Sequence, residues 1–228
     1  MKNISKYQLA TAIAILFHII GIIGFLFFPS VTFIKTTPLN LLLMCGLLFY
    51  TQEKKNRHFY IFFGLCVVTG IAVEILGTST GLLFGNYSYG TVLGPGIYNV
   101  PYIIGVNWFI IIYCCAVSIN TLLRHLTARL AEQTGKPSKA IQVLSVMVDG
   151  ATIAVFFDWL MEPVAVKLGY WQWLGSGEIP LYNYLCWFII SMVLLLVFQK
   201  LQFARQNKFA VNLLLIQSMF FLLLRTFL

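Results

Sequence analysis

Apolar residues form seven long stretches of this chain, and most polar residues lie in the segments between them. A helix needs about 20 mainly apolar residues to cross the hydrocarbon core of a bilayer, and most of the stretches approach that length. The pattern therefore predicts an all-α, polytopic integral membrane bundle of about seven transmembrane helices, with residues 1–228 as one transmembrane domain. The expected spans are residues 9–28, 31–50, 59–77, 102–123, 140–168, 183–199 and 209–227.

The first two spans need separate arguments. The run at 9–28 follows Lys2 and Lys6, as a secretory signal would. It is longer than the apolar part of a signal peptide and lacks a small-residue cleavage site, so we expect a membrane helix. In the second span only residues 38–50 are cleanly apolar, which makes it the weakest of the seven.

The basic residues divide unevenly between the two sides of such a bundle. Because cytoplasmic loops carry an excess of Lys and Arg, the division predicts a cytoplasmic N-terminus in the cell membrane and a C-terminus outside. The cytoplasmic side would hold Lys2, Lys6, Lys54, Lys55, Arg57, Arg124, Arg129, Lys136, Lys139, Lys200, Arg205 and Lys208. The other side would hold only Lys35, Lys167 and Arg225.

The orientation depends on the weak second span. If residues 31–50 do not cross the membrane, the N-terminus moves outside. In both topologies the two aromatic, charge-poor connectors, 78–101 and 169–182, lie on the side opposite the basic loops.

Composition excludes several functional classes. The chain is 60% hydrophobic and 10% charged, which is typical of membrane proteins. The net charge of +8 follows the loop pattern, so we expect membrane lipid and not nucleic acid as a partner. The five cysteines all lie in apolar segments and the three histidines are scattered, which predicts no metal site.

The most unusual stretch is an irregular, Gly- and Tyr-rich segment between the third and fourth helices. Residues 78–101 contain no Lys, Arg, Asp or Glu. A long loop without charge is functional or disordered in most proteins, and the aromatic content of this one argues against disorder. We expect it to pack at membrane depth, where irregular backbone is tolerated if protein buries it or if it lines a cavity.

The helix directions bring a set of polar and aromatic residues into one leaflet, beside both connectors. An acid inside the membrane costs about 2.5–3.5 kcal/mol on insertion scales, so three of them together suggest a function. Asp158 and Glu162 share a helix face, whereas Asp149 lies roughly 180° around the helix. The set comprises Glu74, Asn107, Trp108, Asp158, Glu162, Asn183 and Trp187.

Structural roles are open for several members of this region. Glu162 could lie at the headgroup level and pair with Lys167. Glu74 could bind the backbone of the glycine-rich segment. Trp171 and Trp173 are typical of an interfacial aromatic belt.

The chemistry of such a site would be that of an acid. A carboxyl group in a low dielectric stays protonated near neutral pH and can act as a general acid. Aromatic faces stabilise a cation by about 0.5–2 kcal/mol each. Together they suggest acid chemistry on a very apolar substrate, such as protonation of an alkene.

Two separate blocks of the sequence are distinctive. The first block is GTSTGLLFGNYSYGTVLGPGIYNVPYIIGVNW, preceded by Glu74. The second is DWLMEPVAVKLGYWQW followed by IPLYNYLCW. Both blocks resemble the CruF-type carotenoid-biosynthesis membrane proteins, which include the bisanhydrobacterioruberin hydratases. The resemblance covers about residues 60–190, and its specificity comes from two separate blocks in the same order.

This resemblance implies an enzyme of the hydro-lyase class. It would add water to the terminal double bond of an acyclic carotenoid end group, give a tertiary alcohol and need no redox cofactor. The lipid-soluble carotenoid is the implied partner, and a homo-oligomer or contact with other carotenoid enzymes stays open.

Given that reaction, we assign hypothetical roles. Asp158 is the acid, Glu74 the base or water-orienting group, and Glu162 a support. Asn107 and Asn183 would place water. The end-group pocket would be lined by Tyr87, Tyr89, Trp108, Trp171 and Trp187.

Three other functions are alternatives. A carotenoid end-group cyclase shares the protonation step but excludes water. A non-catalytic carotenoid-binding subunit or carrier would need polar residues through the full membrane, whereas here they gather in one leaflet. A retinal-type receptor would need a lysine in the middle of a span, and none is present.

Overall fold

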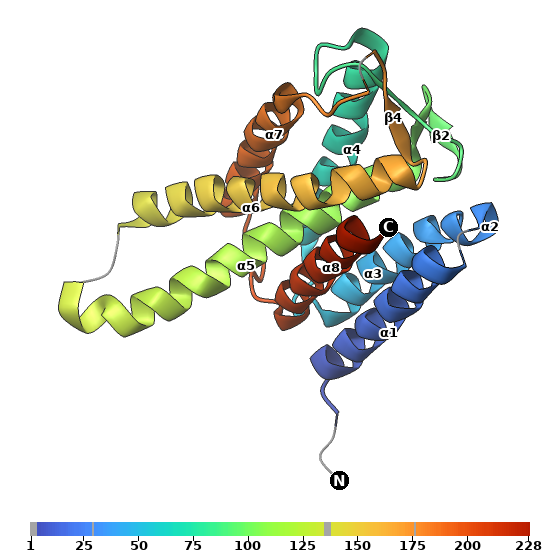
Figure 1. Cartoon of the computed structure of the whole chain (residues 1–228). Coiled ribbons are helices and arrows are strands. Elements are labelled where there is room, and N and C mark those ends of the chain that lie inside the picture. The colour runs from blue at the N-terminus through green and yellow to red at the C-terminus, as the bar shows by residue number, and fades with distance from the viewer. Residues whose placement is uncertain (1–3, 29, 135–137, 176) are drawn as a thin grey trace.

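The computed structural model describes residues 4–28, 30–134, 138–175 and 177–228, and helices dominate it (Figure 1). Seven of its helical segments are long and apolar enough to cross a membrane, which suggests a multi-pass membrane protein. The predicted fold class is therefore confirmed. The helices are α1 (Lys6–Phe27), α2 (Val31–Ile34), α3 (Thr37–Thr51), α4 (Arg57–Thr80), α5 (Tyr102–Thr134), α6 (Lys139–Lys167), α7 (Leu181–Lys200) and α8 (Lys208–Phe227).

Local sequence explains where several helices begin. Ser5, Asn56, Ser138 and Asn207 each occupy the position before a helix and accept a hydrogen bond from a backbone N–H of its first turn. Such caps satisfy N–H groups that have no partner inside the helix. At these four helices the polar residue before the apolar stretch therefore marks the helix boundary.

The weak second span consists of two helices in succession. The short α2 ends at Ile34, and α3 begins at Thr37 with a proline in its first turn. Proline is well tolerated there because the first N–H groups of a helix have no intrahelical partner. Residues Val31–Thr51 together are long and apolar enough to count among the seven candidate spans, as the sequence pattern predicts.

The fourth helix is longer than the sequence pattern predicts. The pattern predicts an end at Leu123 and a polar connector from Arg124 to Lys139. Instead α5 continues to Thr134, because the Leu, Arg, Ala, Glu and Gln residues of this stretch favour helix without an apolar face to bury. Lys136 and Lys2, which the charge argument uses, lie outside the described residues.

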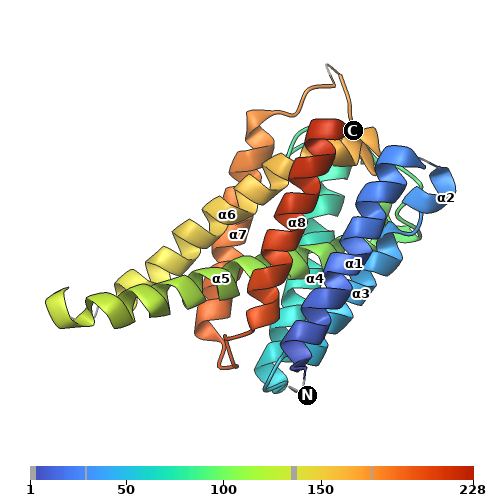
Figure 2. The ribbon, with the colours of Figure 1, turned by 60° about the horizontal axis from the view of Figure 1, so that its bottom comes forward.

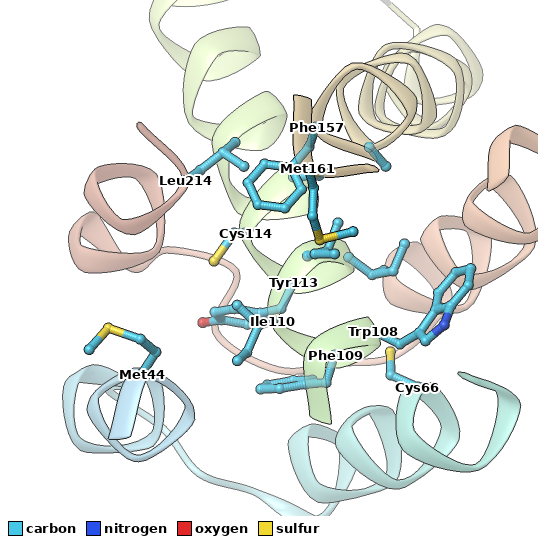
Figure 3. Packing of buried hydrophobic residues seen from close by; sticks show 14 of the residues in the cluster. Met44, Cys66, Trp108, Phe109, Ile110, Tyr113, Cys114, Phe157, Met161 and Leu214 are labelled. Atoms are coloured by element: carbon cyan, nitrogen blue, oxygen red, sulfur yellow. The ribbon is translucent and has the colours of Figure 1, made fainter. Parts of the chain in front are cut away.

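Helix α5 forms the centre of the bundle. It contacts α3, α4, α6, α7 and α8, and its membrane segment is far more buried than the others. Figure 2 shows it crossing behind α1 and α8 at a steep angle. In the close view of the core, side chains of α5 such as Ile110 and Cys114 lie at the centre of a buried cluster that also includes Met44 of α3, Phe157 of α6 and Leu214 of α8 (Figure 3).

The two charge-poor connectors meet at one end of the bundle. Strand β1 (Tyr87–Tyr89), from the connector after α4, pairs antiparallel with β4 (Trp171–Trp173), from the connector after α6. A second small hairpin joins β2 (Gly96–Ile97) and β3 (Val100–Pro101). The chain ends lie at opposite ends of the bundle in Figure 2, as an odd number of spans requires.

Candidate active site

The pairing of β1 with β4 orients four aromatic side chains toward the interior. Side chains alternate between the faces of a strand, so Tyr87 and Tyr89 point the same way, as do Trp171 and Trp173. Tyr87 lies opposite Trp173 and Tyr89 opposite Trp171 in the register. The Y-x-Y and W-x-W sequences thus place two phenols and two indoles on one face of a small sheet.

The two phenols converge on Glu74 of α4. Tyr87 Oη donates to Glu74 Oε2 at 2.5 Å, and Tyr89 Oη donates to the same oxygen at 2.7 Å. The indole Nε1 of Trp108, on α5, donates to Glu74 Oε1 at 3.0 Å. Both oxygens of this carboxyl therefore accept hydrogen bonds from neutral donors, and Glu74 is only 5% exposed.

Two glycines of α4 make this arrangement possible. A Cβ atom at Gly77 would lie 2.7 Å from Tyr87 Oη, and one at Gly70 would lie 2.6 Å from the indole of Trp108. Real Cβ atoms essentially never approach so closely. The absence of a side chain at these positions lets both donors reach the carboxyl from the side of α4.

The phenols are suited to remain donors at neutral pH. Burial, together with the neighbouring Glu74 carboxyl, raises the pKa of the Tyr87 phenol. The same two causes raise the pKa of Tyr89. Both groups therefore keep their protons and hold the carboxyl through O–H donors.

The two indoles converge on a different acid, Glu162 of α6. Trp171 Nε1 and Trp173 Nε1 donate to Glu162 Oε2 at 3.0 Å and 3.1 Å. An indole N–H can only donate, so Glu162 acts here as an acceptor. The paired strands thus hold one carboxyl with phenols and a second with indoles.

Asp158 lies one helical turn before Glu162 and is held differently. It is 1% exposed, and its Oδ2 accepts a hydrogen bond of 2.8 Å from Asn183 Nδ2 at the start of α7. Its Oδ1 is buried and has no hydrogen-bond partner among the described residues. A buried polar atom without a partner needs an explanation, such as a role in catalysis or a bound water.

These three carboxyls line one small cavity of about 30 Å³, which we call the carboxyl cavity. A cavity needs about 10–15 Å³ to hold a water molecule, so there is room for water. The indoles of Trp108 and Trp187, stacked at 3.9 Å and 7°, form part of its wall. Among the described residues, no Lys or Arg lines it.

The sequence model of the family described as "Carotenoid biosynthesis protein" matches residues 34–228, far more than half of the chain. The chain belongs to the carotenoid biosynthesis protein family. The resemblance noted in the sequence is thereby confirmed, and the protein acts in carotenoid biosynthesis. The family match extends beyond residues 60–190 and includes α3 and α8.

The chain is similar to a curated protein, the bisanhydrobacterioruberin hydratase of Haloarcula japonica, with 28% identity over 132 residues. The aligned part makes up 55% of this chain and 40% of the relative. The chain thus spans about two fifths of the length of the relative it matches. No solved structure matches the chain.

The carotenoid-family fold brings together all the candidate residues from the sequence. Every one of them lines the carboxyl cavity: Glu74, Tyr87, Tyr89, Asn107, Trp108, Asp158, Glu162, Trp171, Asn183 and Trp187. Asp149 is exposed on the other side of α6, where Ser145 donates to it, as the helical geometry predicts.

Two of the purely structural roles that the sequence leaves open do not agree with the structure. Lys167 is exposed, and no ion pair with Glu162 occurs among the described residues, since indoles hold this acid. Trp171 and Trp173 are each 8% exposed, so they are not belt residues at the interface. Glu74 does tie down the glycine-rich segment, but through tyrosine side chains and not through the backbone.

Sequence reasoning missed several residues of the site. Trp173 holds Glu162 as directly as Trp171 does, and the repeated period of two in Y-x-Y and W-x-W could have indicated it. Phe84, Ile104 and Met161 also line the carboxyl cavity. These three are apolar residues within apolar sequence, and no pattern distinguishes them.

Proposed function

We propose that this member of the carotenoid biosynthesis family hydrates the terminal double bond of an acyclic carotenoid end group and forms a tertiary alcohol. The observation that carries the proposal is the carboxyl cavity, where three buried acids are held only by neutral donors. The name of the Haloarcula japonica relative supports the same reaction. The residue roles below are parts of this proposal.

The first step is transfer of a proton to carbon. Asp158 acts in its protonated form, and Oδ1 is the proton-bearing atom because it has no partner, whereas Oδ2 is occupied by Asn183. The alkene π electrons form the new C–H bond, Asp158 becomes a carboxylate, and a tertiary carbocation remains. The stacked Trp108 and Trp187 and the neighbouring phenols stabilise this cation through their ring faces, by about 0.5–2 kcal/mol each.

The second step is capture by water. A water molecule in the carboxyl cavity forms the C–O bond, and the proton it loses passes to Glu74. Transfer of one proton from Glu74 back to Asp158 restores the starting state, so the reaction consumes one water and no net proton. Asn107, which makes no side-chain hydrogen bond among the described residues, orients the water.

Glu162 supports this chemistry at a distance of one helical turn from Asp158. Its hydrogen bonds to Trp171 and Trp173 fix the wall that β4 contributes. We also propose that the N-terminus is cytoplasmic, which would place the carboxyl cavity in the half of the membrane away from the cytoplasm.

The test is expression in cells that make lycopene, followed by mass analysis of the extracted pigments. We expect a mass gain of one or two water molecules per carotenoid. Asp158→Asn should lower the yield by about 10²–10⁴-fold, the usual contribution of a general acid. Asp149→Asn, on the exposed face of the same helix, is the matched control and should behave as wild type.

Other outcomes would contradict the proposal. An unchanged mass with a shortened chromophore would indicate end-group cyclisation. Bound pigment without any chemical change would indicate a carotenoid-binding subunit. Full hydration by a folded Asp158→Asn variant would refute the role of Asp158.

A further inference from the structure

A second, larger cavity lies beside the carboxyl cavity. It has a volume of about 340 Å³, within the range of about 300–1,000 Å³ that small-molecule sites occupy. Its walls come from α1, α2, α3, α5, α6 and α8, and aromatic and aliphatic side chains such as Phe25, Phe33, Phe220 and Phe221 dominate them. We call it the apolar cavity.

The two cavities share walls. Ile104 and Asn107 of α5, Met161 of α6 and Trp171 of β4 line both of them. A group that fills the apolar cavity as far as these residues would reach the edge of the carboxyl cavity. The larger cavity therefore lies next to the carboxyl cavity, and these four side chains form the junction between the two.

The other end of the apolar cavity faces the surroundings of the bundle. Phe17 and Ile20 of α1 and Leu39 of α3 line it and are 43%, 46% and 67% exposed. In a membrane-spanning bundle, large exposed apolar side chains on these helices face lipid chains. An apolar molecule dissolved in the bilayer could thus enter between α1 and α3 without crossing water.

We propose that the apolar cavity is the substrate chamber, which admits a carotenoid end group from the bilayer between α1 and α3 and presents its terminal double bond at the junction. This inference rests on the proposed function for its chemistry. The occupant is a carotenoid because the chain belongs to the carotenoid biosynthesis family and because the apolar cavity shares lining residues with the cavity of the three acids. A phospholipid acyl chain is the competing occupant that the experiment must separate.

Neighbouring leucines of α3 offer a matched test. Leu41 is partly buried and lines the apolar cavity, whereas Leu42 is 53% exposed and does not line it. Leu41→Trp would fill part of the chamber, and Leu42→Trp makes the same chemical change on the lipid face. Leu39→Trp adds the same bulk at the exposed mouth, where the core is not disturbed, and serves if Leu41→Trp fails to fold.

The experiment has two readouts in lycopene-producing cells. One is the lycopene or hydrated product that stays with the purified protein, and the other is the yield of hydrated carotenoid. We expect Leu41→Trp to lower both by about tenfold or more, equivalent to about 1.4 kcal/mol of binding. Leu39→Trp should lower both in the same direction, and Leu42→Trp should match wild type.

The possible outcomes distinguish a failure of the substrate-chamber proposal from a failure of the hydratase proposal. If wild type retains lycopene without hydrating it and Leu41→Trp loses the pigment, the chamber stands and the hydratase proposal fails. If folded Leu41→Trp and Leu39→Trp keep wild-type pigment and product, the chamber is refuted while hydration stands. Equal losses in Leu42→Trp, or only phospholipid in the purified wild type, also overturn the chamber.

Discussion

A methyl group added at Gly77, on the face of α4 that packs against Tyr87, should disturb the hydrogen bond between Tyr87 and Glu74. In Gly77→Ala the new Cβ would lie 2.7 Å from Tyr87 Oη, 3.1 Å from the carbonyl oxygen of Leu83 and 3.1 Å from the ring of Phe84. Tyr87 cannot move freely, because its phenol is bound to Glu74 at 2.5 Å. Either the strain remains or the phenol leaves the carboxyl.

The magnitude follows from two opposing effects. Replacing glycine by alanine inside a helix gains about 1 kcal/mol. Inserting a methyl group into a packed site costs about 1–3 kcal/mol, and losing a hydrogen bond to a carboxylate costs about 1.5–3 kcal/mol. Since only one of these two losses applies, the net change in the free energy of unfolding should be about 0–2 kcal/mol of destabilisation.

Gly64 provides the control on the same helix. A Cβ there would meet nothing within 4 Å, so Gly64→Ala should keep the helical gain without the clash. The difference between the two variants should be about 1–3 kcal/mol, and it isolates the contact with Tyr87. Unfolding in mixed detergent micelles measures stability, and pigment mass analysis measures hydration, which should fall only in Gly77→Ala.

Two results would refute this reasoning. Equal stability of the two variants would mean that Tyr87 does not press against α4. Wild-type hydration by Gly77→Ala would mean that the Tyr87–Glu74 hydrogen bond does not matter for the reaction.

Further predictions concern the hydrogen-bond donors to Glu74 and Glu162 and the close packing of α5 against α4. Tyr87→Phe removes one of the donors to Glu74 and should destabilise the fold by about 1.5–3 kcal/mol if the acceptor is ionised, as unfolding in detergent would show; an unchanged stability would argue for a neutral pair. Trp173→Phe keeps an aromatic ring but removes the indole N–H donor to Glu162, so hydration should fall while the protein still inserts, with Trp159→Phe on the exposed face of α6 as control. Gly70→Ala would press on Trp108 at 2.6 Å and should lower hydration as Gly77→Ala does; full activity would contradict the tight packing of α4 on α5.

The sequence alone identified the helical bundle and the polar residues of the site. Membrane insertion depends on the apolar length of each segment, which is local, so even the divided second span could be predicted. The cost of an intramembrane acid is also a local property, and it marked Glu74, Asp158 and Glu162. Helix direction then placed them at one end of the bundle, where the structure has them.

The tertiary structure decided how these acids are held and where an apolar molecule could approach them. The pairing of β1 with β4 joins segments 84 residues apart, and no local pattern specifies such a register. The apolar cavity likewise depends on how α5 packs among five other helices. Hydropathy records the cost of placing each residue in the membrane, whereas the donors of a carboxyl and the shape of a cavity arise only from contacts between segments distant in sequence.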